Sequence, residues 1–425
     1  MAETNRGRVA VVPESTFGET PADPKFKVLR LTNAGLQYTK NTTESNELDS
    51  TRMLADLIEV SASSGGNLDF ELSPASYDPL IEAVLGGARS PAIDLLPGTA
   101  EIIGGELHAP GALGAIRKGQ WLLLQDWAEP ENNGWRQVVS IAGEPDHVTM
   151  TRVVDESSVT SGTVRGQTVT NSVGERSFSV EESYLDVGMH RLFRGMRVSS
   201  MSLSFSAGSI LTGSFNFLGT DSVVEASTSW LGAGTRDEPN GTPVMNASAN
   251  VGDVIIDDSV TTACFQSIDL TIDNSLREVH CLGKKFAGSI NYGRQMVSGS
   301  FTKLFFDWTT YKKMLEDDAI SLSFGAFNAD GGLHVHLPRV KLTSNLVDLA
   351  GGNDSDVQEK VDFKAVKSED GTHQIRIDLA APGILMGGPV VINGGIAASV
   401  YANWLDGGNA DPVFSDWLNG GSAAP

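Results

Sequence analysis

Cysteine is scarce in this chain, which has only Cys264 and Cys281 among its 425 residues. So few cysteines exclude a disulfide framework and any repeated Cys-x-x-Cys metal motif. The two residues lie in neighbouring predicted strands, where a contact between them is one alternative. We predict instead that they are two buried thiols.

Long hydrophobic runs are also missing. No window approaches the ~18 consecutive apolar residues of a membrane span. Residues 1–12 include Arg6 and Arg8 but no apolar core long enough for a signal peptide. We therefore expect a protein that is made and kept in a cytoplasm.

Positive charge is in short supply, since 31 Lys and Arg residues stand against 53 Asp and Glu residues, for a formal net charge of −22. A conventional nucleic-acid reader carries a basic face, and no basic stretch of that kind is evident. A strongly acidic chain stays soluble through self-repulsion and repels nucleic acids and anionic membranes.

Catalytic motifs are missing as well. There is no Ser-His-Asp order, phosphate-binding loop or complete dinucleotide fingerprint. With 53 carboxylates in the chain, pairs suited to a glycosidase arise by chance. His334 and His336 share a strand face, but no third metal ligand is evident, so packing roles are favoured. We expect no enzyme activity, no cofactor and no metal.

What the chain does have is the texture of a β protein. Forty-six glycines separate short runs of Val, Ile, Thr and Ser, and hydrophobic residues make up 40% of the chain, enough for packed cores. In residues 67–72, Leu68, Phe70 and Leu72 alternate with polar residues, which predicts a half-buried strand. The length predicts about two to four domains.

The sequence also repeats itself. The segment 77–82 (YDPLIE) returns as 311–316 (YKKMLE), and each follows a Gly-led β stretch, at 66–70 and 299–303. Upstream of each lies another predicted strand, and a charged loop joins the two strands. A chain with two copies of one β domain offers two equivalent surfaces, which favours an assembly subunit over an enzyme built around one cleft.

We predict a mainly β fold with two tandem sandwich or barrel domains, each with a short helix. The divisions are an N-terminal arm at 1–26, copy one at 27–97 and 173–235, a small inserted β-barrel at 98–172, copy two at 236–382, and a Gly-rich extension at 383–425. The upstream strands are expected at 28–40 and 265–273. The first helix is expected at 77–85, because Pro79 suits a first turn and Gly86 suits a C-terminal stop.

These segments carry a resemblance. Residues 14–21, 31–35, 57–60, 65–72 and the helix at Tyr77, followed by 201–205, 213–217 and copy two, resemble the tail tube (major tail) proteins of long flexible-tailed bacteriophages in their internally duplicated form. No single motif is diagnostic, and the order of many weak ones makes the match.

The resemblance implies a structural subunit of the phage virion, without catalytic residues, that is assembled in the cytoplasm of the host bacterium. Its rings stack into a tube through which double-stranded DNA passes without specific binding. Since six tube domains surround the axis in this family, two domains per chain imply a trimeric ring with pseudo-six-fold symmetry. The implied partners are further copies of the chain and the tape measure, tail terminator and tail tip proteins.

Two sets of residues are expected to act in such a tube. The proposed lining of the channel is the polar face of two alternating strands: Asn67, Asp69, Glu71, Asp269, Thr271 and Asp273. The alternative is that these are ordinary solvated faces of monomeric sheets. Inter-subunit contacts are expected from the charged loops at 41–52 and 274–285, with these candidates: Glu44, Glu47, Asp49, Arg52, Arg277, Lys284 and Lys285.

A rival hypothesis concerns the insertion, which contains Trp121, Trp127 and Trp135. Exposed tryptophans on a small barrel would form a sugar-binding platform, making the protein a carbohydrate-binding adhesin module of a virion. We favour the other interpretation, in which these rings pack the core of the insertion.

Overall fold

The computed structural model describes residues 3–48, 50, 53–141, 146–156, 162–348 and 356–380. The predicted fold class is confirmed, because the described part of the chain is mainly β and has two α-helices. Neither helix has the length and apolar character needed to span a membrane. The Gly-rich extension at 383–425 lies outside the described residues.

Copy one contains η1 (Thr4–Arg6), β1 (Gly7–Pro13), β2 (Lys25–Val28), β3 (Asn33–Ala34), β4 (Gln37–Glu44), β5 (Leu57–Glu71), α1 (Asp78–Leu85), β13 (Phe178–Tyr184), β14 (Met189–Ser206), β15 (Thr212–Gly219), β16 (Asp221–Glu225), η3 (Ser229–Leu231) and β17 (Thr235–Asp237). The insertion contains β7 (Glu101–Ile103), β8 (Glu106–His108), β9 (Trp121–Gln125), η2 (Pro130–Asn132), β10 (Gly134–Ile141), β11 (His147–Met150) and β12 (Thr163–Thr170), and β6 (Ile93–Leu95), which lies just before its expected start, joins its sheet. Copy two contains β18 (Ile255–Ile256), β19 (Ser259–Val260), β20 (Phe265–Asp273), β21 (Arg277–Val279), β22 (Ser289–Asn291), β23 (Met296–Leu304), α2 (Thr309–Leu315), β24 (Ile320–Asn328), β25 (Gly331–Asp348), β26 (Gln358–Ala365) and β27 (Arg376–Ala380).

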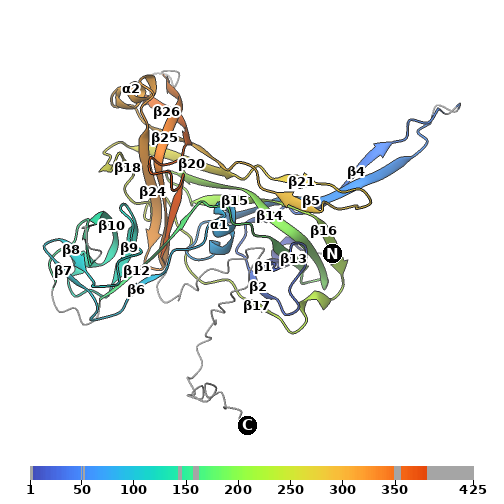
Figure 1. Cartoon of the computed structure of the whole chain (residues 1–425), viewed down its shortest axis with the longest axis horizontal. Helices are drawn as coiled ribbons and strands as arrows, with labels where there is room; N and C mark the ends of the chain where they lie inside the picture. The colour runs from blue at the N-terminus through green and yellow to red at the C-terminus, as the bar shows by residue number, and fades with distance from the viewer. Residues whose placement is uncertain are drawn as a thin grey trace, which may run out of the picture.

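One antiparallel sheet runs through both copies (Figure 1). Copy one contributes β3 and β4 at one edge, followed by β5, β15 and β14. Copy two repeats this spatial order with β20, β23, β26 and β25. The two halves join where β14 pairs with β20, from Ser200 opposite Asp273 to Ser206 opposite Ser267.

The strands β14 and β25 occupy the same place in the two copies, and each has 18 residues. Each has a register shift at the matching point, between Val198 and Ser200 in β14 and between Leu342 and Ser344 in β25. Corresponding residues of these two strands are therefore 144 positions apart. A bulge kept at one position in both copies bends each long strand from one sheet region into the next.

The N-terminal segment differs from its prediction. Residues 7–13, which were expected in a polar arm, form β1 and pair with β13 along its whole length. The run Val9–Val12 is buried. Four consecutive apolar residues are typical of a strand covered on both faces, and that signal outweighs the polar residues around it.

The insertion was predicted to be a barrel, and this prediction is wrong. Its strands form an open ladder in the order β7-β8-β11-β10-β9-β12-β6, and among the described residues β6 and β7 do not pair to close it. The physical reason lies in β12, whose second half leaves the ladder and pairs with β27 of copy two. The insertion still has an apolar core of its own, which includes Leu122, Leu124 and Trp127.

The predicted helix at 77–85 is confirmed as α1, which has Pro79 in its first turn and ends at Gly86 in the left-handed region. A Cβ at Gly86 would lie 2.8 Å from the carbonyl oxygens of Ser172 and Gly174, so both backbone conformation and close approach favour glycine. The helix packs into one apolar core that is shared by both copies.

Candidate functional site

The six predicted channel residues lie on one face of the continuous sheet. Asp69 of β5 is opposite Ser214, which is opposite Ser202, which is opposite Thr271 of β20. The next residues along each strand, such as Leu68 and Ile268, point to the other face and are buried. We call this surface the polar face. It comprises Asn67, Asp69, Glu71, Ser200, Ser202, Ser204, Thr212, Ser214, Asn216, Asp269, Thr271, Asp273, Ser298, Ser300, Thr302, Lys360, Asp362 and Lys364.

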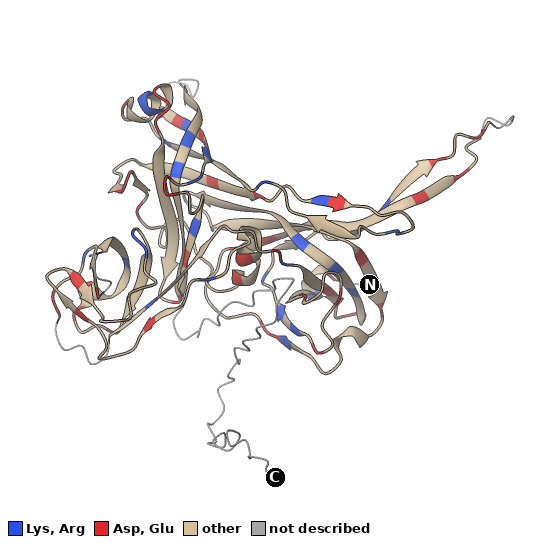
Figure 2. Cartoon of the chain, in the orientation of Figure 1, with Lys and Arg blue, Asp and Glu red and all other residues tan. Residues whose placement is uncertain are grey.

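Sequence reasoning found only the acidic strands of this face. The signal it missed is a period-two alternation of hydroxyl residues, for example Ser200, Ser202 and Ser204 in β14. It also missed the cations at the copy-two end, since Lys360 and Lys364 of β26 are exposed. Figure 2 shows basic and acidic positions interspersed along the strands that lead to α2. The face is thus rich in hydroxyl groups, acidic on β5 and β20, and mixed in charge on β26.

Hydrogen bonds hold the carboxylates of the polar face in place. Asp69 accepts from Asn33 Nδ2 at 2.9 Å and from Asn67 Nδ2 at 2.8 Å, and Asp269 Oδ1 accepts from Ser204 Oγ at 2.6 Å. Partial burial would raise the pKa of Asp69, but hydrogen bonds from Ser214, Asn33 and Asn67 lower it below its ordinary value. This carboxylate is therefore ionised at neutral pH.

The sheet ends in two strand edges that have no partner within the described residues. On β25, the segment from Ser344 to Asp348 pairs only with β26. On the opposite side, β3 and β4 pair only with β5. The corresponding segment of β14 pairs with both β15 and β20. Unpaired edges of this kind are templates for adding another strand.

The first charged loop forms the end of a long hairpin of β4 and β5 that projects from the body (Figure 1). Glu44 and Glu47 are exposed on it, while Asp49 and Arg52 lie outside the described residues. The hairpin also exposes apolar side chains near its end: Leu48, Met53, Leu54, Leu57, Ile58 and Val60. The prediction that this segment projects agrees with the geometry, although β4 continues into it as far as Glu44.

The second charged loop lies against the base of that hairpin within the same chain. Lys285 Nζ is 2.7 Å from Glu59 Oε1, and the Ala62 amide donates to the Lys285 carbonyl at 3.1 Å. Arg277 and Lys284 are exposed. Lys285 of the second loop thus pairs with Glu59 of β5 in its own chain, whereas the sequence suggested that this lysine contacts a neighbouring subunit.

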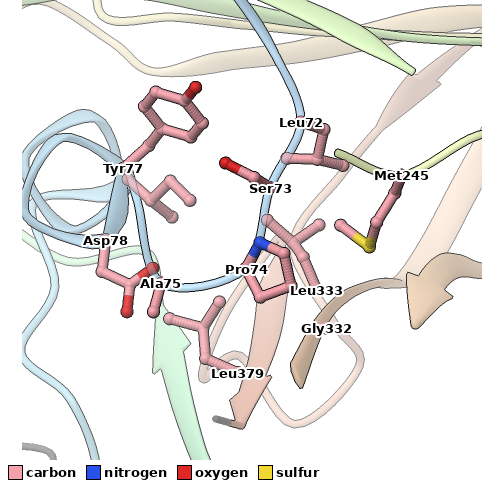
Figure 3. A pocket seen from close by; sticks show the side chains of 11 residues that line it. Leu72, Ser73, Pro74, Ala75, Tyr77, Asp78, Met245, Gly332, Leu333 and Leu379 are labelled. Carbon is pink, nitrogen blue, oxygen red and sulfur yellow. The ribbon is translucent and has the colours of Figure 1, made fainter. Parts of the chain in front are cut away.

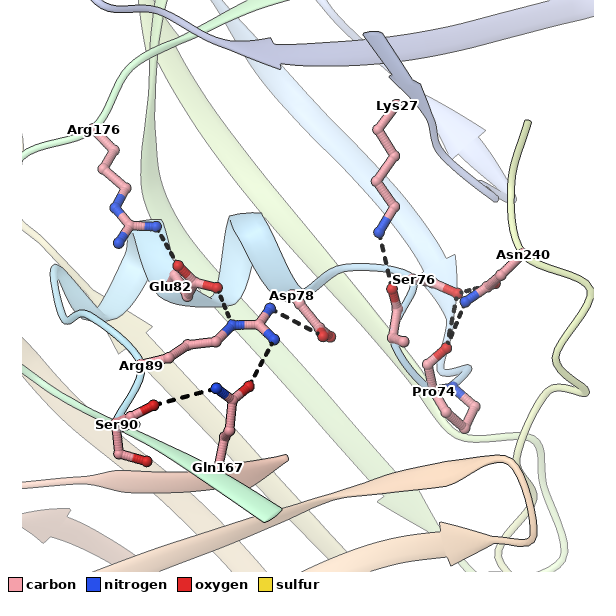
Figure 4. A network of polar contacts seen from close by, with 11 residues as sticks. Lys27, Pro74, Ser76, Asp78, Glu82, Arg89, Ser90, Gln167, Arg176 and Asn240 are labelled. Atoms are coloured by element: carbon pink, nitrogen blue, oxygen red, sulfur yellow. Dashed lines mark hydrogen bonds and ion pairs between the residues drawn. The ribbon is translucent and has the colours of Figure 1, made fainter. Parts of the chain in front are cut away.

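A buried ionic network joins α1 to the insertion (Figure 4). Arg89 binds Glu82 and lies 3.1 Å from Asp78, while Arg176 also binds Glu82. Gln167 of β12 accepts from Arg89 at 3.4 Å. Burial would lower the pKa of Arg89, but the two carboxylates raise it. Because each charge faces a counter-charge, the network serves attachment rather than proton transfer.

The tryptophans of the insertion do not form an exposed platform. Trp121 and Trp127 are buried, and Trp127 Nε1 donates to the Thr163 carbonyl at 3.1 Å. The Trp121 and Trp135 rings pack on Phe327 of copy two, with centroid distances of 5.1 and 4.5 Å. The rings therefore fill the core and the interface with copy two, and the sugar-binding hypothesis loses its surface.

His334 and His336 belong to this same interface. His334 is fully buried with Nδ1 3.6 Å from Asp378 Oδ2, and Arg376 Nε donates to Asp378 Oδ1 at 2.8 Å. The Trp121 amide also donates to Asp378, at 3.1 Å. Within the described ranges, no cluster of three or more candidate ligands could hold a metal ion. Cys264 and Cys281, predicted to be buried, are both exposed, since each lies beside a strand rather than inside one.

We expect this interface to weaken in acid. Burial, together with the nearby Arg376 cation, lowers the pKa of His336 to about 3, and burial lowers the pKa of His334 although Asp378 opposes it. His373 also faces this group. The unfolded chain takes up these protons below pH 6.5, whereas the folded chain does not, so stability falls as the pH drops from 6.5 towards 3. For His336 the loss is ~1.4 kcal/mol per pH unit.

The measurement is urea unfolding at pH 7 and pH 5 for the natural chain and for His336→Gln. The Gln variant keeps a partner for Ser323, whose hydroxyl lies 2.6 Å from His336 Nδ1, but does not titrate. The variant should lose about 2 kcal/mol less than the natural chain between the two pH values. Equal losses would show that His336 is not protected from protonation.

A polar sheet face, two free strand edges and a projecting hairpin together define a β subunit built for self-assembly. The chain belongs to the phage tail tube protein family, whose model matches residues 4–365. No curated protein matches the chain. The resemblance found in the sequence is thereby confirmed: this is a structural subunit that assembles with itself into a tube in the virion tail. A structural family of this kind points to a non-enzymatic role.

Proposed function

We propose that the chain closes into rings by pairing β25 of one subunit with β3 and β4 of the next. The observation that carries this proposal is the β14–β20 junction inside the chain. That junction joins the last strand of copy one to the first strand of copy two. The same two positions in the strand order are the edges that have no partner within the described residues.

The internal junction also supplies a register for the proposed one. Residues of β25 lie 144 positions after their counterparts in β14. Leu68 of β5 and Phe301 of β23 occupy matching positions of the repeat. Their strand partners, Ala34 and Ile268, therefore also correspond, and Ile268 lies 234 positions after Ala34. Since Ser200 faces Asp273, the expected partner of Ser344 is Thr39 of the next chain.

The proposed ring contains three chains. Each contributes two tube domains, so three chains place six domains around the axis with pseudo-six-fold symmetry. True six-fold symmetry is excluded within such a ring, because only copy one contains the insertion.

The polar face is the proposed wall of the channel. A conduit for DNA should not hold it, because each phosphate neutralised by a cation adds affinity. Asp69, Glu71, Asp269 and Asp273 would repel the polymer, and the hydroxyl strands between them add no charge. Lys360 and Lys364 of β26 are outnumbered by the five carboxylates of the polar face, so the face as a whole is acidic. The other face of the sheet packs against the apolar core, so it does not line the proposed channel.

Stacking is assigned to the two charged loops. The hairpin of β4 and β5 would reach the adjacent ring with Glu44, Glu47 and Asp49, while Arg277 and Lys284 remain available to receive it. Exposed ion pairs contribute only ~0–1 kcal/mol each, so the apolar residues of the hairpin must supply much of the strength. At its ends, the tube would meet the tape measure, tail terminator and tail tip proteins.

Electron microscopy of the purified chain tests the proposal. Tubes whose averaged rings show three-fold symmetry are expected, with chemical cross-linking that stops at three chains per ring. Rings of six chains would overturn the stoichiometry. A protein that remains monomeric at high concentration would overturn ring closure itself.

Shortening the hairpin should separate ring closure from stacking. Replacing residues 43–58 by a two-residue turn joins Thr42 to its pairing partner Glu59, removes the projecting end, and leaves the edge at residues 33–39 intact. We expect a folded subunit that forms single rings and no tubes, seen by microscopy and analytical ultracentrifugation. A matched control replaces Glu44 and Glu47 by Gln, which keeps the hairpin. Normal tubes from the shortened variant would contradict the assignment.

A further inference from the structure

The two helices have opposite surroundings although the sequence repeats them. In α1, all residues except Pro79 are buried, whereas α2 has no buried residue. At matching positions of the repeat, Ile81 is 3% exposed and Leu315 is 67% exposed. The turn before α2 also exposes Phe306 and Trp308. We call Phe306, Trp308 and Leu315 the helix patch.

Copy two covers part of α1, in addition to β14 of copy one and β12 of the insertion. Figure 3 shows the turn before α1 lying against Gly332, Leu333 and Leu379, with Ile81 lining the same pocket. At the C-terminal end of α1, the Val84 carbonyl accepts from Asn274 Nδ2 at 3.0 Å and from Gln295 Nε2 at 2.8 Å. Copy two, the domain that follows α1 in the sheet, thus completes the burial of this helix, which also packs on β14 and β12.

Copy one exposes the counterparts of those covering groups. Leu333 of β25 corresponds to Met189 of β14, 144 positions earlier, and their exposures are 3% and 47%. Ile377 of β27 lies two residues from the pocket residue Leu379, on the same face of the strand. Val224 occupies the place of Ile377 in β16, since these two residues pair with the corresponding residues Val335 and Arg191. Val224 is 68% exposed, whereas Ile377 is fully buried.

Charge follows the same correspondence. The counterpart of Asn274 is Lys40, 234 positions earlier, and its side chain is 60% exposed beside Glu59. The end of α2 is followed by Glu316, Asp317 and Asp318, of which Asp317 already pairs with Lys341. A lysine suits both the C-terminal end of a helix and an acidic cluster. Without a cation nearby, acidic residues at the C-terminal end of a helix are unfavourable.

We propose that the helix patch of one chain docks on copy one of the next chain, with Leu315 against Met189 and Val224, and with Lys40 at Glu316 and Asp318. This inference rests on the proposed ring and adds to it a second contact, outside the sheet. The occupant is another copy of this chain, because both halves of the contact are exposed on it and match the halves that meet around α1. The hairpin of β13 and β14 and the helix α2 lie well apart in Figure 1, so one chain cannot make the contact alone.

The first test is a cross-link between chains. Met189→Cys and Leu315→Cys are introduced together with Cys264→Ser and Cys281→Ser, and assembled tubes are treated with a short bismaleimide. Covalent dimers and trimers are expected on a denaturing gel, with none from dilute monomers. A control with Leu315→Cys alone should give monomers. Absence of cross-links in tubes formed by the double-cysteine variant would overturn the docking but not the ring.

The second test is a charge exchange read by the rate of assembly in light scattering. Lys40→Glu, and separately Glu316→Lys with Asp318→Lys, should each slow assembly at least threefold. The three changes combined should restore most of the rate, and Lys118→Glu on the insertion should have no effect. If the natural chain forms tubes and the exchanges change nothing, the docking is overturned while ring closure stands. If the natural chain forms no tubes, the proposed function itself fails.

Discussion

Val347→Pro should yield a folded subunit that no longer closes into rings. In the junction inside the chain, the Asn274 amide donates to the Ser199 carbonyl and the Ala207 amide donates to the Gln266 carbonyl. Alternate residues of β14, beginning at Ser199, therefore direct their backbone groups to β20. Val347 corresponds to Leu203 in that series, so its amide points to the free edge and not to β26.

Proline at this position removes an edge donor and places a ring where the incoming strand would lie. Proline is tolerated on edge strands whose N–H faces solvent, so folding of the isolated chain should be preserved. The concentration needed for tube formation should rise by at least ~10-fold, which corresponds to ~1.4 kcal/mol per junction. The measurement is a sedimentation assay over a concentration series, with circular dichroism to confirm the fold.

The control is Val347→Ala, which keeps the amide and should assemble. A second variant, Tyr38→Pro, tests the opposite edge. The Gly35 amide donates to the Asn67 carbonyl, so every second residue from Gly35 onward directs its backbone groups to β5. Tyr38 belongs to the other set, and its amide points to the free edge. Normal tubes from both proline variants would mean that subunits do not join through these edges.

Charge reversal of the polar face should slow the release of DNA from phage. Replacing Asp69, Glu71, Asp269 and Asp273 by Lys should leave the fold intact, because these side chains lie opposite the core and strand pairing uses backbone groups. Around three chains, the four changes would add roughly a dozen cations to each ring. Phosphate binding at that density should reduce the ejection rate by at least ~10-fold at low salt, and by less as salt rises.

The experiment follows ejection by phage that carry the variant across a salt series. A neutral variant with Asn or Gln at the same four positions should show a much smaller effect. Glu129→Lys with Glu131→Lys, on the exposed surface of the insertion, should show none. An unchanged rate for the four-lysine variant at low salt would mean that another face lines the channel.

Local patterns predicted the elements whose neighbours are close in sequence. Alternation in residues 67–72 predicted β5 and the face it presents, and Pro79 with Gly86 marked both ends of α1. The repeat predicted that β14 and β25 would correspond, and their shared bulge supports this. These signals survive because hydrophobic period and turn chemistry act over a few residues.

Long-range pairing could not be predicted in the same way. The open ladder of the insertion depends on β12 reaching β27, more than 200 residues later. The burial of His334 and of the Trp121 ring depends on that same meeting of distant segments. Likewise, the serine strands of the polar face become a surface only when β14 lies between β15 and β20. No local period encodes which strand becomes the neighbour of another.

The covalent link across the β14–β20 junction changes how a ring can grow. In a ring of six tube domains made from three such chains, every second joint is formed during folding and cannot dissociate. Closing the ring then takes two encounters between molecules instead of five, and each encounter avoided spares the translational and rotational entropy of one association. Only two species then precede the closed ring, namely a single chain and a pair of chains. In the proposed three-chain ring, the internal repeat thus shortens the path to closure and leaves fewer incomplete rings with open edges.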